Sequence, residues 1–220
     1  MNTIPLLQFS LDFITIPSAL AAAFKVAEHV DIIEIGTPLC KAAGMDAVRA
    51  VREIYPEKPI LADMKTPDVG GLEAQLAFNA GANLMTVMGG APLTTLESAM
   101  RVAKETGNEV LVELTGTGRQ FERIEDWKRL GVERVVYHRG WDEGVSNREW
   151  SQYDLVKIRG LIDEGFKVSI AGGICVELLP LFKDLPISII VVGRAIHQAR
   201  DPIASVRQLR ATIASFWANH

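Results

Sequence analysis

The chain has 220 residues, 48% of them hydrophobic and 23% charged, with a formal net charge of −4 at pH 7. This composition suits one domain with a large core, and no basic run is long enough to indicate nucleic acid or an anionic membrane surface as a partner. The longest apolar runs have the length of strands, so no transmembrane helix is expected. The N-terminus lacks the regions of a signal peptide, and two cysteines far apart argue against a disulfide framework or a zinc site. We therefore expect a reducing, cytoplasmic location.

Short apolar runs alternate with amphipathic stretches along the whole chain. The residues expected to form strands are 6–13, 30–36, 59–65, 84–89, 109–116, 134–140, 167–173 and 188–196. The residues expected to form helices are 17–29, 45–55, 70–80, 93–106, 121–130, 152–164, 176–183 and 202–217. The fourth of these helices shows the pattern well, because Leu93, Leu96, Met100 and Ala103 form one apolar stripe that ends before Gly107.

Eight alternating strand and helix units favour a parallel sheet. Since the units share 220 residues, we predict an α/β fold with a single domain over residues 1–220, a closed (β/α)8 TIM barrel. An open, doubly wound sheet is the alternative fold. It would require a glycine-rich dinucleotide loop after the first strand, and the segment LDFITIPSA that follows that strand has none.

The C-terminal ends of the predicted strands carry many polar residues, and barrels of this kind build their sites there. These residues are Asp12, Glu34, Asp63, Lys65, Thr86, Glu113, His138, Arg139 and Arg194. Asp63 and Lys65 are two positions apart on one strand, so both should face the barrel mouth, and Asp68 follows on the loop. Any one of them could be a helix cap, a solvated charge or a core histidine. Together they would leave several buried acids without partners unless the site binds something.

Glycines follow the last two strands, as Ala171-Gly172-Gly173 and as Gly193-Arg194. Barrels commonly bind a phosphate group at this position, where backbone N–H groups and an arginine supply an anion site. The alternative is that these glycines only make tight turns. Because Arg194 accompanies them, the pattern favours a phosphate site.

Glu34 and Asp63 end neighbouring strands, and two carboxylates suit a hard divalent ion, Mg2+ before Zn2+. The alternative is a hydrogen-bonded acid pair or a salt bridge to Lys65. A metal and a protonated lysine opposite a phosphate anchor would suit a reaction through an enediolate. Asp63 and Asp68 should both keep Lys65 protonated. A proton could then be handled by His138 and Glu113.

The segment DMKTPD resembles the Asp-x-Lys-x-x-Asp motif of the orotidine 5′-monophosphate decarboxylase suprafamily. Within it, the chain resembles the 3-keto-L-gulonate 6-phosphate decarboxylases and their sister group, the 3-hexulose 6-phosphate synthases. The resemblance covers nearly the whole chain, through LDF, VDIIEIGTPL, VELTG, VVYHR, AGGI and VVGRAI. It implies a Mg2+-dependent, homodimeric barrel that forms an enediolate. The decarboxylases make L-xylulose 5-phosphate and CO2 in L-ascorbate catabolism, and the synthases condense formaldehyde with ribulose 5-phosphate.

The resemblance also implies roles for individual residues. Glu34 and Asp63 would bind Mg2+, Lys65 would stabilise the enediolate, and Asp68 would reach into the site of the partner subunit. The positions implied for substrate contact or proton delivery are Asp12, Glu113, His138, Arg139, Ala171, Gly173, Gly193 and Arg194.

The choice between the two sister groups depends on a few positions. Glu113 and Arg194 favour the decarboxylases, whereas GTPL and the segment from ADMKTPD to FNAGA favour the synthases. Two departures from the decarboxylases are Trp141, where they carry a second arginine, and Ala171, where they carry threonine. We predict a decarboxylase, with the synthase as the alternative. A non-catalytic sugar-phosphate binder and an aldolase or epimerase on a pentulose phosphate also stay open, as does whether Trp141 and Trp150 cover the site or pack beside it.

Overall fold

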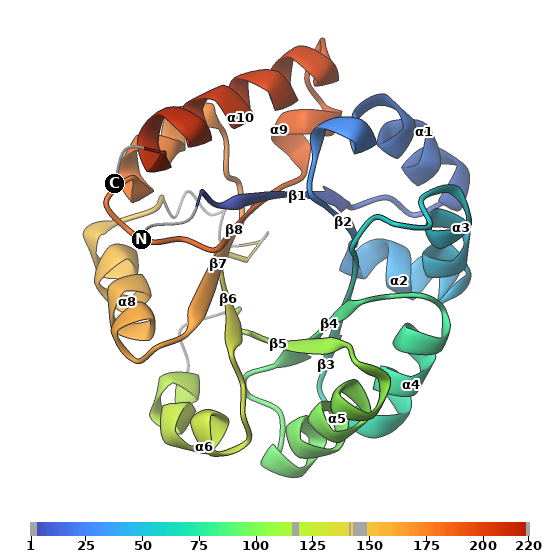
Figure 1. Cartoon of the computed structure of the whole chain (residues 1–220), viewed down its shortest axis with the longest axis vertical. Coiled ribbons are helices and arrows are strands. Elements are labelled where there is room, and N and C mark those ends of the chain that lie inside the picture. The colour runs from blue at the N-terminus through green and yellow to red at the C-terminus, as the bar shows by residue number, and fades with distance from the viewer. Residues whose placement is uncertain (1–3, 116–118, 141, 143–148, 219–220) are drawn as a thin grey trace.

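The computed structural model describes residues 4–115, 119–140, 142 and 149–218. Eight parallel strands close into a barrel in chain order, and the helices form a ring around it (Figure 1). The predicted (β/α)8 barrel is confirmed, and all eight strands lie within their expected ranges apart from Thr66. The strands are β1 Leu6–Leu11, β2 Ile32–Ile35, β3 Ile60–Thr66, β4 Leu84–Met88, β5 Glu109–Glu113, β6 Arg134–His138, β7 Lys167–Ala171 and β8 Ile189–Val192. The prediction that one domain spans residues 1–220 stays a prediction.

The helices follow the strands in the expected order, with short 3-10 segments between them. The α-helices are α1 Ile16–Val26, α2 Thr37–Ala43, α3 Asp46–Ile54, α4 Gly70–Asn79, α5 Leu93–Thr106, α6 Ile124–Arg129, α8 Gln152–Asp163, α9 Arg194–His197 and α10 Pro202–Trp217. The 3-10 segments are η1 Ala27–His29, η2 Arg119–Arg123 and η3 Val176–Phe182. No helix in the described ranges is both long and apolar enough to cross a membrane.

Three differences from the expected elements have local causes. Helix α2 was not expected, and it begins at Thr37 with Pro38 in its first turn, where the fixed φ of proline suits a helix. The last strand was expected to reach residue 196 but ends at Val192, because α9 starts immediately after Gly193. Segment η3 contains Pro180, which lacks the N–H that an α-helix requires, so the expected helix is a 3-10 segment.

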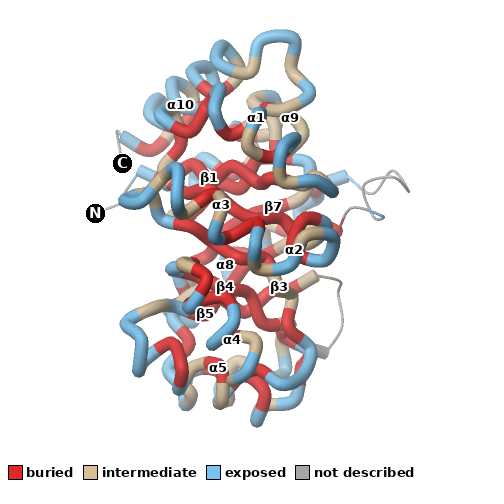
Figure 2. The backbone as a smooth tube through the Cα atoms, turned by 90° about the vertical axis from the view of Figure 1, so that its right-hand side faces the viewer, coloured by how far each residue is buried: buried red, intermediate tan, exposed pale blue. Residues whose placement is uncertain are grey.

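The barrel interior is apolar toward the N-terminal ends of the strands and polar toward their C-terminal ends. Its lower layer is an apolar cluster made of Ile32, Leu61, Leu84, Leu111, Val136, Ala171, Ile189 and Val191. Side chains on one face of a strand recur every second residue. Two positions further along five of these strands stand Glu34, Asp63, Thr86, Glu113 and His138. Figure 2 shows the buried strands at the centre and exposed helical surfaces outside. The same periodicity that fills the barrel therefore places the polar side chains above its floor.

At the opposite end, Arg52 at the end of α3 ties the loops before β3 and β4 together. Its guanidinium donates to the carbonyl oxygens of Gly81 at 2.8 and 2.9 Å, of Tyr55 at 3.0 Å and of Lys58 at 2.9 Å. It also donates to the side-chain oxygen of Asn83 at 2.5 Å. This end of a barrel contributes to stability, so Arg52 is a structural residue.

Candidate active site

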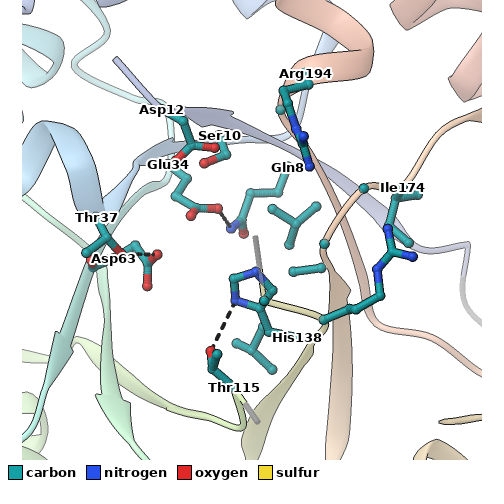
Figure 3. Close-up of a pocket in the computed structure, with 18 of the residues that line it drawn as sticks. Gln8, Ser10, Asp12, Glu34, Thr37, Asp63, Thr115, His138, Ile174 and Arg194 are labelled. Atoms are coloured by element: carbon teal, nitrogen blue, oxygen red, sulfur yellow. Dashed lines mark hydrogen bonds between the residues drawn. The ribbon is translucent and has the colours of Figure 1, made fainter. Parts of the chain in front are cut away.

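A cavity of about 920 Å³ opens at the C-terminal ends of the strands. All eight strands, or the loops that follow them, contribute to its wall. The predicted site residues that line it are Asp12, Glu34, Asp63, Lys65, Glu113, His138, Arg139, Ala171, Gly173, Gly193 and Arg194. Carboxylates from the first strands face one side of the cavity, and Arg194 stands across from Asp63 and Thr37 (Figure 3). The cavity is therefore polarised, with acids at one end and a cationic wall at the other.

Lys65 lies between two buried carboxylates. Its Nζ donates to Oδ2 of Asp63 and lies 3.9 Å from Oε2 of Glu113. Burial opposes the charged form, but the charges of Glu113 and Asp63 outweigh it and raise the pKa of Lys65 above its ordinary value. Lys65 is therefore an ammonium group at neutral pH, suited to stabilising negative charge and not to forming a Schiff base.

The backbone at Lys65 is unusual for a strand. Its φ is 47°, in the left-handed region, and the pairing of β3 with β4 shifts register between Ala62 and Thr66. The backbone N–H of Lys65 donates to Oγ1 of Thr86 at 2.9 Å. The expectation that Asp63 and Lys65 meet in the barrel mouth is confirmed, but an irregular strand and not simple alternation brings them together.

Asp63 is held by two threonines as well as by Lys65. Oγ1 of Thr37 donates to its Oδ2 at 2.6 Å, and Oγ1 of Thr86 donates to its Oδ1 at 2.7 Å. Burial alone would raise the pKa of Asp63, but Lys65 and these hydrogen bonds lower it below the ordinary value. Asp63 is thus a fixed carboxylate. The sequence analysis did not predict Thr37 as a site residue. Its position directly after the second predicted strand could have indicated it.

Glu34 has the opposite protonation behaviour. Burial, followed by the charges of Asp63 and Asp12, raises its pKa to about 8. Nε2 of Gln8 donates to its Oε2 at 2.5 Å. Gln8 and Ser10 also line the cavity, and the sequence analysis did not predict them. They could have been found, because polar residues occupy every second position of the first strand up to Asp12. The charge of Lys65 only partly offsets the effects of burial and of the two carboxylates, so the protonated form of Glu34 is favoured at neutral pH.

Asp12 packs against two glycines. A Cβ on Gly36 would collide with Oδ1 of Asp12, and a Cβ on Gly193 would lie 3.1 Å from Oδ2. Burial raises the pKa of Asp12, and a hydrogen bond from Ser10 partly offsets this effect. The phosphate contact predicted for Gly193 stays a prediction, and in the structure its lack of a side chain leaves room for this carboxylate.

His138 and Glu113 form a second hydrogen-bonded pair in the cavity. Nδ1 of His138 lies 2.8 Å from Oε1 of Glu113 and 3.3 Å from Oγ1 of Thr115, whose hydroxyl also donates to Glu113. Burial lowers the pKa of His138, but the charge of Glu113 and this hydrogen bond raise it overall. The raised pKa increases the protonated fraction of the imidazole at neutral pH, which is what a proton donor in the cavity requires.

Gly172 and Gly173 form a turn at the other end of the cavity, with φ values of 104° and 70° that favour glycine. A Cβ on Gly172 would collide with the carbonyl oxygen of Arg139, and one on Gly173 would collide with its Nη2. The guanidinium of Arg139 thus lies against this turn, and Arg194 lines the same cavity. Exposed backbone and two arginines make this end suitable for an anion.

Asp68 stands apart from the other predicted site residues. It is exposed, it is not among the described residues that line the cavity, and its Oδ1 accepts from the backbone N–H of Val69 at 2.7 Å. The backbone turns at both Lys65 and Val69, each with a φ of 47°, and carries Asp68 outward. The expectation that Asp68 keeps Lys65 protonated is therefore wrong within one subunit, where Glu113 takes that place.

The two tryptophans of the loop after β6 can be treated separately. Trp141 lies outside the described residues. Trp150 is 7% exposed and packs behind the cavity instead of covering it.

Comparison with known proteins gives the family. Residues 5–209 match the model of the orotidine 5′-phosphate decarboxylase / HUMPS family, and the chain belongs to this family. The predicted resemblance and the class of enzyme, a carbon–carbon lyase of the carboxy-lyase kind, are confirmed.

Individual relatives are similar over their whole length. The chain is 40% identical over 215 residues to the 3-keto-L-gulonate-6-phosphate decarboxylase UlaD of Escherichia coli, covering 98% of this chain and 99% of that protein. A crystal structure of the Streptococcus mutans decarboxylase in complex with a sugar phosphate superposes with a TM-score of 0.94 at 32% identity, over 98% of this chain and 100% of that one. A 3-hexulose-6-phosphate synthase structure gives a TM-score of 0.88 at 39% identity, over 95% and 100%.

Proposed function

We propose that the protein decarboxylates 3-keto-L-gulonate 6-phosphate to L-xylulose 5-phosphate and CO2, as a step of L-ascorbate catabolism. The observation that carries the proposal is the Lys65 ammonium, held between Asp63 and Glu113 at one end of a cavity whose other end suits an anion. The names of similar relatives support the same substrate.

The polarity of the cavity gives the substrate one orientation. Arg139, Arg194 and the turn at Gly172–Gly173 hold the phosphate, so the carbons next to the carboxylate lie beside Lys65. Cleavage of the C1–C2 bond releases CO2 and leaves its electron pair on C2, conjugated with the C3 carbonyl. The negative charge of this enediolate develops on oxygen, where the Lys65 ammonium donates a hydrogen bond.

A proton must then reach C2. His138 is suited to deliver it, because its raised pKa increases its protonated fraction at neutral pH and Glu113 fixes its ring. Delivery is direct or through one water molecule, and protonation gives the terminal CH2OH of the product. Arg139 lies on the same side of the cavity and orients the substrate.

Mg2+ is the cation that we propose for the acidic end. No three acids, histidines or cysteines converge into a metal site within the described ranges, but Glu34 and Asp63 offer two buried sets of carboxylate oxygens. Their repulsion helps to raise the pKa of Glu34, and a divalent cation would relieve it. Oxygen donors suit Mg2+, with water and substrate oxygens completing its shell. When bound, it would supply further positive charge near the developing oxyanion.

A homodimer is the assembly that we propose. Helix α4 begins two residues after Asp68. Val69 at its N-cap is 55% exposed, and Leu72 and Leu76 on its outer face are 58% and 46% exposed. Two apolar side chains one helical turn apart, with a third at the N-cap, suit a contact with a second copy. Such a contact would allow Asp68, which points away from its own cavity, to serve the site of the partner subunit.

The synthase reaction is the second candidate, because Ala171 departs from the decarboxylases and the synthase structure is 39% identical. Condensation of formaldehyde with ribulose 5-phosphate would pass through the same kind of enediolate. The membership of a lyase family argues against a non-catalytic binder.

A paired assay separates these candidates. One arm follows CO2 release from 3-keto-L-gulonate 6-phosphate, and the other follows formaldehyde consumption with ribulose 5-phosphate, each with Mg2+ and then with EDTA. We expect Mg2+-dependent CO2 release well above the rate of condensation. Dominant condensation would assign the synthase reaction instead, and turnover in neither arm would refute both.

A further inference from the structure

Trp150 is buried behind the anion end of the cavity, where it contacts the guanidinium of Arg139 and the backbone of Gly172. We propose that Trp150 is a positioning residue, which holds Arg139 and the turn at Gly172–Gly173 in one arrangement and so sets the affinity of the cavity for the phosphate end of its substrate. The inference rests on the proposed function, because it takes this turn as the phosphate site.

The first contact is with the backbone of the turn. Nε1 of Trp150 donates to the carbonyl oxygen of Gly172 at 3.1 Å. A peptide bond is planar and trans, so the C=O of Gly172 and the N–H of Gly173 point in opposite directions. Because Trp150 holds the carbonyl on the side away from the cavity, the N–H of Gly173 is turned toward the cavity that Gly173 lines. Glycine has many accessible conformations, and the indole selects one of them.

The second contact is with the guanidinium of Arg139. Its Cζ lies 5.8 Å from the centroid of the Trp150 ring, within the range of a cation–π interaction. The backbone N–H of Arg139 donates to the carbonyl oxygen of Ala171 at 3.0 Å, directly before the turn. One indole ring therefore fixes an arginine and a glycine turn that follow different strands, β6 and β7.

The indole is itself held from behind. It packs edge-on against Phe182 at 5.0 Å and in a tilted arrangement against Tyr137 at 5.9 Å between ring centroids. The hydroxyl of Tyr137 donates to Oδ1 of Asp154 at 2.7 Å, and Oδ2 of Asp154 accepts from the backbone and side chain of Ser151 at the start of α8. Trp150 thus cannot turn without disturbing a packed set of aromatic residues, which suits it to positioning others.

Two substitutions separate its contacts, and another tryptophan supplies the control. Trp150→Phe keeps an aromatic face for Arg139 but loses the N–H, and Trp150→Leu loses both. Trp217 is buried, donates its Nε1 to the carbonyl oxygen of Leu185 at 2.8 Å and does not line the cavity. Trp217→Phe therefore removes the same kind of hydrogen bond from the core elsewhere.

The measurement is calorimetric binding of L-xylulose 5-phosphate, with inorganic phosphate as a competitor, alongside kcat and KM. We expect Trp150→Phe to weaken the binding of both ligands about tenfold, which is the effect of losing one well-aligned hydrogen bond. Trp150→Leu should weaken the binding of both ligands further. KM should rise in parallel while kcat stays within about threefold. Trp217→Phe should leave both affinities unchanged even where it lowers the melting temperature equally.

Unchanged affinity in a folded Trp150→Phe variant would overturn the inference and leave the proposed reaction intact. Weakened binding with no turnover in the wild-type protein would refute the reaction and support the role of Trp150. If the leucine variant does not fold, the phenylalanine variant alone decides. A wild-type protein that binds neither ligand would overturn both the phosphate site and the role of Trp150.

Discussion

Replacement of Lys65 by alanine tests the mechanism most directly. The ammonium donates to Asp63 and lies 3.9 Å from Glu113, and in the proposed reaction it is the fixed positive charge beside the reacting carbons. Removing one preorganised donor to an oxyanion typically costs about 3–4 kcal/mol of transition-state stabilisation, and we expect a loss of about a thousandfold in kcat.

The same substitution should also weaken the fold. Asp63 and Glu113 are 6% and 2% exposed, and they would lose the cation that both face. Breaking a buried ion pair costs about 3–5 kcal/mol. Because Lys65 is partly exposed, we expect the free energy of unfolding to fall by about 3 kcal/mol, the lower end of this range. Turnover is measured as CO2 release with saturating Mg2+ at a temperature where circular dichroism shows the variant folded. Urea unfolding gives the stability.

Lys167→Ala is the matched control. Its Nζ pairs with Oε2 of Glu133 at 2.7 Å, but both side chains are more than half exposed, and such pairs contribute less than about 1 kcal/mol. This variant should keep wild-type turnover and stability. Wild-type turnover in Lys65→Ala would refute the mechanism, whatever the stability of the variant.

Three further predictions concern other parts of the molecule. The pKa of Glu34 is raised from 4.5 to about 8, so the folded protein keeps a proton that the unfolded chain has lost, and in EDTA its melting temperature should fall as pH rises between these values. Glu34→Gln should flatten this slope in calorimetry, and an unchanged slope would contradict the assignment. Leu72 is 58% exposed in one subunit, and Leu72→Asp would put a charge into the apolar contact proposed for the dimer. This variant should therefore be a monomer in sedimentation, whereas a persisting dimer would exclude α4 as the interface. Arg52→Ala should lower the free energy of unfolding by about 2–3 kcal/mol and leave kcat unchanged, and a large loss of kcat would contradict a purely structural role.

The positions of the site residues could be predicted because they depend on two simple regularities. A barrel gathers the ends of its strands at one rim, and side chains repeat every second residue, so Glu34, Glu113 and His138 could be assigned from strand ends alone. Gln8 and Ser10 obey the same rule and could have been found by extending it backwards along the first strand.

Other features depend on contacts that no local pattern carries. The left-handed backbone of Lys65 and the shifted register of β3 arise where two strands meet, and the outward path of Asp68 follows from them. Similarly, the contact between Trp150 and Gly172 joins residues 22 positions apart, so the sequence left open whether Trp150 covers the site. Tertiary packing, and not propensity, decides such details.

The backbone of Val69 has a consequence for engineering. A β-branched residue with a φ of 47° stores about 1–2 kcal/mol that an asparagine would release, because asparagine tolerates the left-handed region. A search for heat-resistant variants would therefore select Val69→Asn. In the proposed dimer, the exchange would also remove an apolar side chain from the contact and alter the backbone that carries Asp68 toward the partner subunit. Selection for heat resistance would then reward changes that erode catalysis, so this loop is one to exclude from any stabilising redesign.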